Sequence, residues 1–405
     1  MGLAKQAMLE DIDRGYCSVG EQYVCASCFN DEAIEEFIEE NAESDQCDFC
    51  GEVSDEGLIA APIDKVIELI VESIEYEWGS PEDEGVAWES REGGWQGHVT
   101  DSYDLLVDEL EIVNNQKVLD AISNALVDRQ WCQKDYYALP PEKALMYGWE
   151  EFCKQVKYKT RYVFFRVKDS EDSYRGVEEI KPRYMLDALA GIVSESQILS
   201  EVRPGTEFYR VRVHDPGEHF GQSAELGPPP ESCAIFSNRM SPAGISMFYG
   251  AVEESTAIEE TFDSNRPGPS VATVGVFKTL KTFKVLDLSK LPKVPSLFDE
   301  GVRHLRPGIS FLYDFVRDIS KPIVKDGREH IEYVPTQVMT EFFQYIFEDQ
   351  DGENLKGIFY PSSRNKGGVA CALFFSQKDC CDSDYSGEKK WLRLDNQNVY
   401  RRSLP

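Results

Sequence analysis

Apolar positions recur at helical spacing through the first half of the chain. The longest stripe has acidic residues on its opposite face and predicts an amphipathic helix; its members are Ile63, Val66, Ile67, Ile70, Val71 and Ile74. A shorter stripe over residues 31–43 begins at Asp31, a favourable N-cap. Further helical patterns cover residues 103–113, 118–132, 142–157 and 183–193. Residues 78–97 are rich in Gly, Trp and Glu and predict a structured loop.

Near residue 200 the pattern changes to short runs of β-type residues. The predicted strands cover residues 207–213, 246–252, 271–280, 283–288, 357–360 and 370–376. Predicted helices separate them at residues 256–262, 308–320 and 335–348. Strands with irregularly interposed helices are typical of an α+β domain with a mixed β-sheet.

These patterns divide the chain into four predicted segments. We expect a cysteine-rich segment over residues 1–60 and a helical domain over residues 61–195. A mixed-sheet domain follows over residues 200–380, and residues 381–405 predict a polar, peripheral tail. The predicted fold class of the whole chain is α+β.

The formal net charge is −31 over 405 residues, and the uneven distribution of acidic residues along the chain argues against one class of partner. Residues 1–115 hold 31 acidic and 4 basic residues, whereas residues 116–405 hold 42 acidic and 38 basic residues. Binding a phosphate backbone needs Lys and Arg, so this distribution argues against nucleic acid as a partner of the N-terminal part.

The cysteine count and the hydropathy pattern indicate a cytoplasmic protein that does not enter a membrane. The chain has no run of about eighteen apolar residues, the length that spans a bilayer. Its first residues lack the apolar centre of a signal peptide. Eleven cysteines, an odd number, do not suit a secreted disulfide framework.

Four of the cysteines have the spacing of a zinc site. Cys25 and Cys28 form one C-x2-C pair, and Cys47 and Cys50 form a second pair after 18 intervening residues. Each pair places two thiolates on a tight turn, and two such knuckles complete a tetrahedron around Zn²⁺. Four protein ligands leave no open position, so we expect the zinc to be structural.

Arg91 and His98, with Trp95 between them, form a second candidate site. Their spacing resembles the arginine–histidine motif of HEPN ribonucleases, which implies contacts with an RNA 2′-hydroxyl and phosphate. Gly93 and Gly94 disfavour a helix at this point, and the surrounding acidic charge repels phosphate. We therefore favour an ordinary loop arginine and surface histidine at these positions.

The predicted sheet domain carries two arginines, a tyrosine, a carboxylate and a hydroxyl near strand ends or helix starts: Arg210, Arg239, Tyr249, Glu260 and Ser362. Neither a Ser-His-Asp arrangement nor a glycine-rich phosphate loop is evident. The set suits binding of a diphosphate by guanidinium groups while a carboxylate acts on a sugar. Taken singly, each of these residue types is more often an ordinary surface or core residue than part of a functional site.

The blocks around these residues resemble those of the RES family, in the same order, along residues 200–376. The blocks are Tyr209-Arg210, Asn238-Arg239-Met240-Ser241-Pro242-Ala243-Gly244, Phe248-Tyr249-Gly250-Ala251, Thr256-Ala257-x-x-Glu260 and Gly357-Ile358-Phe359-Tyr360-Pro361-Ser362. The acidic first part, with its four cysteines and Glu92-Gly93-Gly94-Trp95, resembles the HEPN-like N-terminal domain found fused to RES domains. The resemblance implies an ADP-ribosyltransferase-like fold and an enzyme that releases nicotinamide from NAD⁺ by hydrolysis or phosphorolysis.

The resemblance also implies a role for each residue. Arg210 and Arg239 would bind the diphosphate or an incoming phosphate, and Tyr249 would pack against the nicotinamide or its ribose. Glu260 would hydrogen-bond that ribose and offset the positive charge of an oxocarbenium-like centre. Ser362 would orient the ribose or the carboxamide. Arg210, Glu260 and Ser362 are thus the predicted catalytic residues.

The choice of residue within two of the blocks stays open, as do two other functions. Glu259 adjoins Glu260 and Ser363 adjoins Ser362, although position within each block favours Glu260 and Ser362. The alternative functions are transfer of ADP-ribose to a macromolecule and an RNA-binding or RNA-cleaving HEPN module. Many RES proteins are toxins of toxin–antitoxin pairs, which implies a toxin or defence effector that binds an antitoxin or another regulatory protein through its N-terminal module. We also expect a homo-oligomer.

Overall fold

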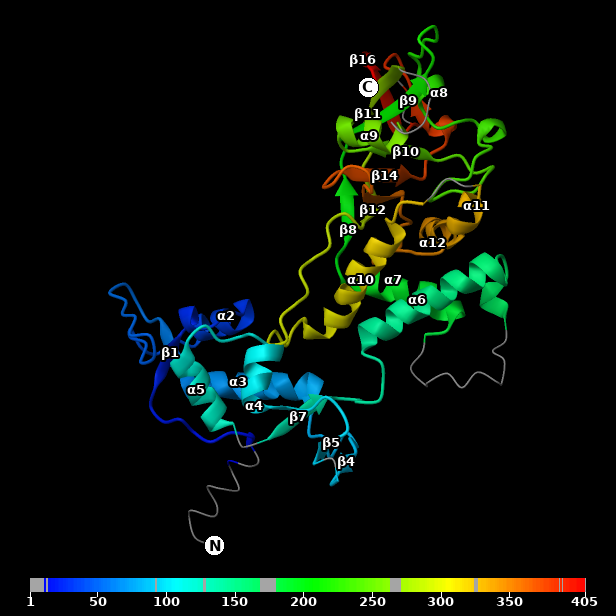
Figure 1. The fold of residues 1–405 in the computed structure, drawn as a ribbon. Helices are drawn as coiled ribbons and strands as arrows, with labels where there is room; N and C mark the ends of the chain where they lie inside the picture. The colour runs from blue at the N-terminus through cyan, green and yellow to red at the C-terminus, as the bar shows by residue number, and fades with distance from the viewer. Residues whose placement is uncertain are drawn as a thin grey trace, which may run out of the picture. The chain divides into compact units, whose positions relative to one another are not determined.

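The computed structural model describes residues 11, 14–91, 93–126, 129–167, 180–262, 271–323, 327–385, 387 and 389–404 (Figure 1). The chain divides into two compact units, which we call unit 1 (Met1–Leu139 and Val294–Arg306) and unit 2 (Pro140–Lys293 and Pro307–Pro405). Helices and strands are mixed along the chain, which confirms the predicted α+β class. Among the helices of the described ranges, none is long and apolar enough to cross a bilayer.

Helix α3 (Ile63–Glu77) forms the centre of unit 1, as its apolar stripe predicts. Val66, Ile67 and Ile70 are fully buried, and α2 (Glu32–Glu40) and α5 (Gln116–Ala125) contribute buried side chains to the same core. The N-cap prediction for α2 is confirmed, because the Asp31 carboxylate accepts hydrogen bonds from two backbone N–H groups of the first turn.

The predicted helix over residues 118–132 is too long. Helix α5 ends at Ala125, and β7 (Gln130–Gln133) pairs with β3 (Trp78–Gly79) on one side and β6 (Thr100–Asp101) on the other. Trp131 of β7 is buried and donates from Nε1 to Ser102 Oγ at 3.0 Å. This long-range pairing outweighs the helical pattern that continues into residues 126–132.

Two other predictions in unit 1 change in detail. The predicted loop over residues 78–97 contains the short hairpin of β4 (Trp88–Glu89) and β5 (Gly94–Trp95), whose two tryptophan rings meet edge to face at 5.1 Å. The predicted helix over residues 103–113 is the short α4 (Ser102–Asp104) followed by one π-helical turn, Leu105–Glu109. Glu92 of the predicted motif lies outside the described residues.

A strap from the second half of the chain, Val294–Arg306, belongs to unit 1. Ser296 Oγ donates to the Asp31 carboxylate at 2.8 Å, and Arg306 Nε donates to Glu77 Oε1 at 2.8 Å. Leu297 is buried in the core of this unit. The strap therefore completes unit 1 although it lies far from residues 1–139 in the sequence.

Unit 2 is built on a nine-stranded mixed sheet in the order β15-β16-β11-β9-β10-β14-β13-β12-β8. Its strands are β8 (Leu199–Val202), β9 (Glu207–His214), β10 (Phe248–Ala251), β11 (Val271–Thr279), β12 (Phe283–Asp287), β13 (Gly357–Pro361), β14 (Val369–Leu373), β15 (Cys380–Cys381) and β16 (Leu392–Ser403). The pairs β12–β13 and β15–β16 are parallel, and the other pairs are antiparallel. Because β9, β10, β14 and β13 are neighbours, residues far apart in sequence lie on adjacent strands.

The longer helices of unit 2 share one core with this sheet. They are α6 (Pro141–Tyr158), α7 (Met185–Glu195), α10 (Arg306–Ile319) and α12 (Val334–Tyr345). Trp149 and Phe152 of α6 and Leu189 of α7 are buried in the same cluster as Phe315 of α10 and Ile358 of β13. The expected domain boundary at residue 195 thus falls inside unit 2.

Much of residues 381–405, predicted as a polar and peripheral tail, belongs to the sheet as β16 (Leu392–Ser403). Strand β16 pairs with β11 along Val271–Thr279 and also pairs with β15. Leu392 and Leu394 are fully buried, whereas Arg393 and Asp395, which alternate with them, are polar and only partly buried. A strand with one apolar face needs few apolar residues, so this segment has a polar composition despite its place in the sheet.

Candidate active site and metal centre

A cavity of about 970 Å³ opens in unit 2 beside the strands β9 and β10. Four of the five predicted site residues line it: Arg210, Arg239, Tyr249 and Glu260. Arg210 lies on β9, Tyr249 on the adjacent β10, and Glu260 on α9 (Glu254–Thr261). Its volume falls at the upper end of the range usual for small-molecule sites.

The fifth residue, Ser362, lies directly behind Glu260. Its hydroxyl donates to Glu260 Oε1 at 2.5 Å. Ser362 Oγ also accepts hydrogen bonds from the backbone N–H groups of Arg364, at 3.2 Å, and Asn365, at 3.0 Å. With two donors aimed at it, the hydroxyl has its proton directed at the carboxylate. Ser362 therefore fixes the position of the Glu260 side chain.

The turn that carries Ser362 is itself tied to α9. Asn365 Nδ2 donates to Thr256 Oγ1 at 2.7 Å, and Thr256 Oγ1 donates to Glu253 Oε2 at 2.9 Å. The Val369 N–H donates to the same Glu253 oxygen at 3.1 Å. A Cβ on Gly368 would lie 2.1 Å from Thr256 Oγ1, so this close approach requires glycine. The carboxylate and its serine are thus held by one hydrogen-bonded network.

Arg210 and Tyr249 form a second pair in the cavity. Arg210 donates from Nη1 to the Tyr249 carbonyl at 2.5 Å, and its guanidinium lies 5.3 Å from the centre of the Phe248 ring. Burial lowers the pKa of Arg210 to about 10, so it stays cationic at neutral pH. Burial also raises the pKa of Tyr249 to about 12, and its hydroxyl bonds to Ser241 Oγ at 2.9 Å. The cavity therefore offers one partly desolvated cation beside a neutral phenol.

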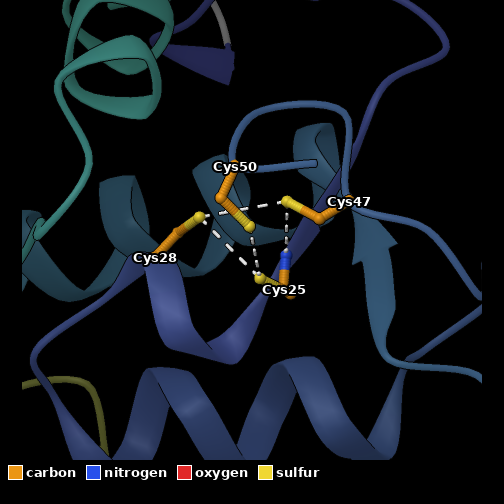
Figure 2. A group of neighbouring side chains, drawn as sticks. All are labelled: Cys25, Cys28, Cys47 and Cys50. Atoms are coloured by element: carbon orange, nitrogen blue, oxygen red, sulfur yellow. Dashed lines mark hydrogen bonds between the residues drawn. The ribbon is translucent and has the colours of Figure 1, made fainter. Parts of the chain in front are cut away.

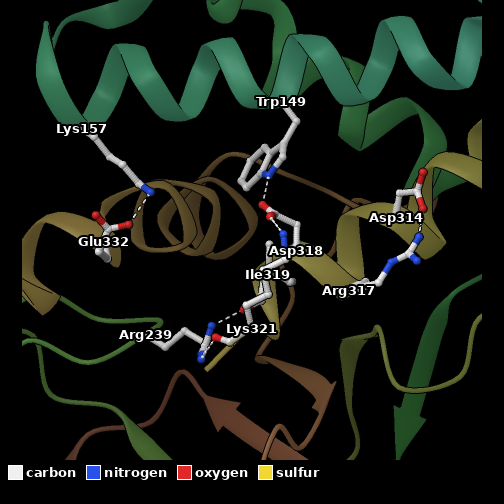
Figure 3. Close-up of polar contacts among 9 residues, drawn as sticks. All are labelled: Trp149, Lys157, Arg239, Asp314, Arg317, Asp318, Ile319, Lys321 and Glu332. Carbon is white, nitrogen blue, oxygen red and sulfur yellow. Dashed lines mark hydrogen bonds and ion pairs between the residues drawn. The ribbon is translucent and has the colours of Figure 1, made fainter. Parts of the chain in front are cut away.

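Arg239 contributes a second guanidinium from a loop (Figure 3). Its Nη2 donates to the Lys321 carbonyl at 2.8 Å, and its Nη1 donates to the Ile319 carbonyl. The guanidinium also lies 5.8 Å from the centre of the Tyr333 ring. These contacts leave N–H groups of the guanidinium for a ligand, because arginine has five.

The predicted zinc ligands come together in unit 1 (Figure 2). The Sγ atoms of Cys25, Cys28, Cys47 and Cys50 all lie within 4.8 Å of one another, and three of the Sγ–Sγ distances are 3.4, 3.8 and 3.9 Å. A tetrahedral ion with Zn–S bonds of about 2.3 Å needs thiolates ~3.8 Å apart, so the donor set fits this geometry. The cluster could hold a metal ion.

The environment of the four thiols differs from one to the next. Burial raises the pKa of Cys25 and raises that of Cys28 to about 12. Burial acts in the same direction on Cys47, but backbone N–H groups of Cys50, Cys25 and Phe49 outweigh it and lower its pKa to about 7. The buried thiols of Cys25 and Cys28 are therefore costly to ionise without a cation beside them, which favours a metal ligand role.

Two family models match the chain. The model of the RES domain matches residues 207–395, and that of HEPN/RES N-terminal domain 1 matches residues 40–170. The chain contains a RES domain. The resemblance inferred from the sequence blocks is thereby confirmed, and a RES domain implies an enzyme that acts on NAD⁺. No curated protein and no solved structure matches the chain.

The two open registers of the RES blocks differ clearly in the structure. Glu260 lines the cavity, whereas Glu259 is exposed and is not among the lining residues. Ser363 lines the cavity, while Ser362 lies behind Glu260 and bonds to it. The geometry therefore separates a residue that holds the carboxylate from one that faces the ligand space.

Arg91 and His98 lie outside the RES domain, on either side of strand β5 in unit 1. Neither belongs to a helix, and both are exposed. His98 Nε2 bonds to Glu109 Oε1 at 2.8 Å, and the backbone N–H of Arg91 donates to Glu89 Oε1 at 3.1 Å. These contacts suit a loop arginine and a surface histidine.

Sequence reasoning missed several side chains that line the RES cavity. Ile235 and Phe236 are 67% and 75% exposed on one loop, and His330 and Tyr333 come from the region of α11 (Glu329–Glu332). A hydrogen bond from the Gly244 N–H to the Ala234 carbonyl, at 2.7 Å, closes the first of these loops. No motif marks these positions. The only sequence signal for Ile235 and Phe236 is that they form an apolar pair within a polar, proline-rich loop.

Proposed function

We propose that the protein cleaves the nicotinamide–ribose bond of NAD⁺ in the 970 Å³ cavity. The observation that carries the proposal is a carboxylate, Glu260, fixed by Ser362 in the same cavity as Arg210 and Arg239. Two guanidinium groups match the two negative charges of a diphosphate. A fixed carboxylate matches the positive charge that develops on a sugar during cleavage.

The reaction needs no acid because nicotinamide leaves as a neutral molecule. The bond between ribose C1′ and the pyridinium nitrogen breaks, and its electron pair neutralises that nitrogen. Positive charge develops on the ribose as an oxocarbenium-like centre, which Glu260 stabilises electrostatically. Water or phosphate then bonds to C1′ and releases a proton, which leaves ADP-ribose or its 1′-phosphate.

The remaining residues bind and orient the dinucleotide in this proposal. Arg210 and Arg239 hold the diphosphate, and Tyr249 packs against the nicotinamide ribose as a neutral phenol, because its pKa is raised by burial. Ser362 acts on the ribose through the position of Glu260. The exposed Phe236 would stack on the adenine, since an aromatic ring at a cavity mouth is a good partner for a base.

The test of this function is incubation of the purified chain with NAD⁺ in buffers with and without phosphate. Nicotinamide release in the buffer without phosphate indicates hydrolysis, whereas formation of ADP-ribose 1′-phosphate in the buffer with phosphate indicates phosphorolysis. With NAD⁺ labelled in its adenine, label that stays attached to protein or nucleic acid would instead indicate transfer of ADP-ribose to a macromolecule. Absence of nicotinamide release in both buffers, from protein shown to be unbound by an inhibitor, would contradict the proposal.

We also propose that the cysteine cluster holds structural Zn²⁺ and stabilises unit 1. Metal analysis should find one zinc per chain, and Cys28→Ser should abolish it and lower the thermal unfolding midpoint. Cys17→Ser is the matched control, because Cys17 is exposed and lies outside the cluster. Equal zinc content in the two variants would contradict the assignment.

The biological setting of the activity completes the proposal. All eleven cysteines lack disulfide partners, which suits a reducing cytoplasm. The excess of acidic residues over residues 1–115 would suit a basic regulatory partner, such as an antitoxin, for a toxin or defence effector. A homo-oligomer is also part of the proposal. Sedimentation of the chain alone and with a co-purified partner tests both.

A further inference from the structure

Arg239 lies between two cavities of unit 2. It lines the 970 Å³ cavity that contains Glu260, and it also lines a smaller cavity of about 360 Å³. The smaller cavity is lined on its other sides by residues of α6 and α10, among them Trp149 and Asp318. A long, flexible arginine side chain in this place has room on both sides, so its guanidinium needs contacts that hold it in one position.

The end of α10 supplies these contacts from the wall of the smaller cavity. Ile319 is the last residue of this helix, and Lys321 follows two residues later. Their carbonyls accept from Arg239 Nη1 and Nη2 (Figure 3). Carbonyls at a helix C-terminus lack intrahelical partners and carry its partial negative charge, so they attract a guanidinium.

Asp318 fixes this helix end from the side of the smaller cavity. Its Oδ1 accepts from Lys321 Nζ at 2.8 Å, and its Oδ2 accepts from Trp149 Nε1 at 2.9 Å (Figure 3). Trp149 is only 1% exposed, and its ring stacks on Phe152 at 5.2 Å and meets Phe315 edge to face at 4.9 Å. A chain of contacts therefore runs from the rigid helix α6 to the guanidinium of Arg239.

We propose that Trp149 and Asp318 are positioning residues that hold Arg239 in place at the wall of the cavity that would take the diphosphate. Trp149 falls within residues 40–170, which match the N-terminal domain model, yet it packs in unit 2 with the RES domain. Helix α6 is thus part of the ligand-binding machinery, although the RES model begins only at residue 207. This inference deepens the proposed function and rests on it.

The physical effect is preorganisation. Without Asp318, the segment after α10 loses its ion pair and its link to Trp149, and the two carbonyls no longer stay in place for Arg239. The guanidinium is then free to move, so ordering it again for a ligand costs free energy at the binding step. Ligand affinity should therefore fall although neither Trp149 nor Asp318 touches the ligand.

The test measures binding of ADP-ribose to the full-length chain by calorimetry, so that turnover is not needed. Arg239→Ala should weaken binding by about 10–100-fold, because it removes a charge-assisted contact. Asp318→Ala and Trp149→Phe should each weaken it by about 3–10-fold. In the Arg239→Ala background, Asp318→Ala should add less than about a twofold effect, because both changes act on one contact.

Asp314→Ala is the matched control. Asp314 lies one turn before Asp318 on α10, and it pairs with Arg317 and with Lys143 of α6 at 3.6 Å, but it makes no contact with Arg239 among the described residues. Its affinity should stay within about twofold of the wild type. Thermal unfolding of each variant shows which changes act on stability alone.

The possible outcomes separate the two proposals. If Arg239→Ala weakens binding but Asp318→Ala and Trp149→Phe bind like the wild type, the positioning role is overturned and the proposed function stands. An Asp318→Ala effect that is undiminished in the Arg239→Ala background would also overturn the role, because it would not pass through Arg239. Absence of ADP-ribose binding to the wild type would overturn the proposed function and this inference with it.

Discussion

Replacing Ser362 with alanine removes a hydroxyl that donates to Glu260 Oε1 and accepts two backbone N–H groups. Alanine keeps the backbone and fits the same space, so the change acts mainly on the position of the carboxylate. Glu260 lines the cavity from α9, and without its partner the side chain can turn away from the cavity. The change therefore tests whether Ser362 acts through Glu260.

The size of the effect follows from the kind of hydrogen bond that is lost. A hydrogen bond to a charged group contributes about 1.5–3 kcal/mol, which corresponds to ~10–150-fold in kcat/KM if the carboxylate acts only in that position. The two N–H groups that lose their acceptor lie near the surface and can bind water. The free energy of unfolding should therefore fall by only about 1 kcal/mol.

The assay is nicotinamide release from NAD⁺, with thermal unfolding measured on the same samples. Ser363→Ala is the comparison, because Ser363 is exposed at the cavity and makes no bond to Glu260 among the described residues. We expect its effect to stay below about tenfold. A Ser362→Ala variant as active as the wild type, or a loss equal to that of Ser363→Ala, would refute this reasoning.

Two further changes test the fold and the adenine site. Lys284 donates to the buried carboxylate of Asp349 at 2.5 Å, so Lys284→Met should lower the free energy of unfolding at pH 7 in urea titrations, because it leaves that carboxylate without its cation. Burial opposes ionisation of Asp349, but the bond from Lys284 outweighs it and lowers the pKa; the stabilisation is thus present above pH ~4 and lost as the pH falls further, where the two proteins should converge. A stability difference that persists in acid would contradict this. Phe236→Ala should raise KM for NAD⁺ by about 5–20-fold, because stacking on the adenine is lost. KM for nicotinamide mononucleotide, which lacks the adenosine, should stay within about twofold. Equal effects on both substrates would contradict the proposed contact of Phe236 with the adenine.

The elements with a strong local pattern could be predicted from the sequence. The stripe of α3 and the apolar runs of β11 and β12 lie within a few residues of their predicted bounds. In these segments the buried face is visible as a period, because each element has one side in a core. The α+β class followed from the order of these elements.

Which segments pack together when they lie far apart in the sequence could not be predicted in the same way. The helical pattern of α6 shows that one face is buried, but not that this face packs on α10 and the sheet of unit 2. The strap Val294–Arg306 has no periodicity that assigns it to unit 1. Strand β16 has too few apolar residues to stand out from a polar tail. In each case the deciding contact is long-range.

For the candidate site, the sequence predicted which residues take part but not how they contact one another. The resemblance to RES blocks supplied all five predicted residues, and the structure brings four of them to one cavity. That Ser362 lies behind Glu260, and that Arg239 is held by carbonyls about eighty residues away, depends on tertiary contacts. The four cysteines were easier to predict, because their spacing itself expresses the geometry of a tetrahedral ion.

The most direct test of the account compares Glu260→Gln with Glu259→Gln in the NAD⁺ assay. Glutamine keeps the shape of the side chain and can still accept from Ser362, but it removes the negative charge that Glu260 brings to the cavity. We expect Glu260→Gln to lower kcat by about 100–1,000-fold, while Glu259→Gln, at an exposed neighbour, stays within about twofold of the wild type. Nicotinamide release by Glu260→Gln at the wild-type rate would contradict the central claim.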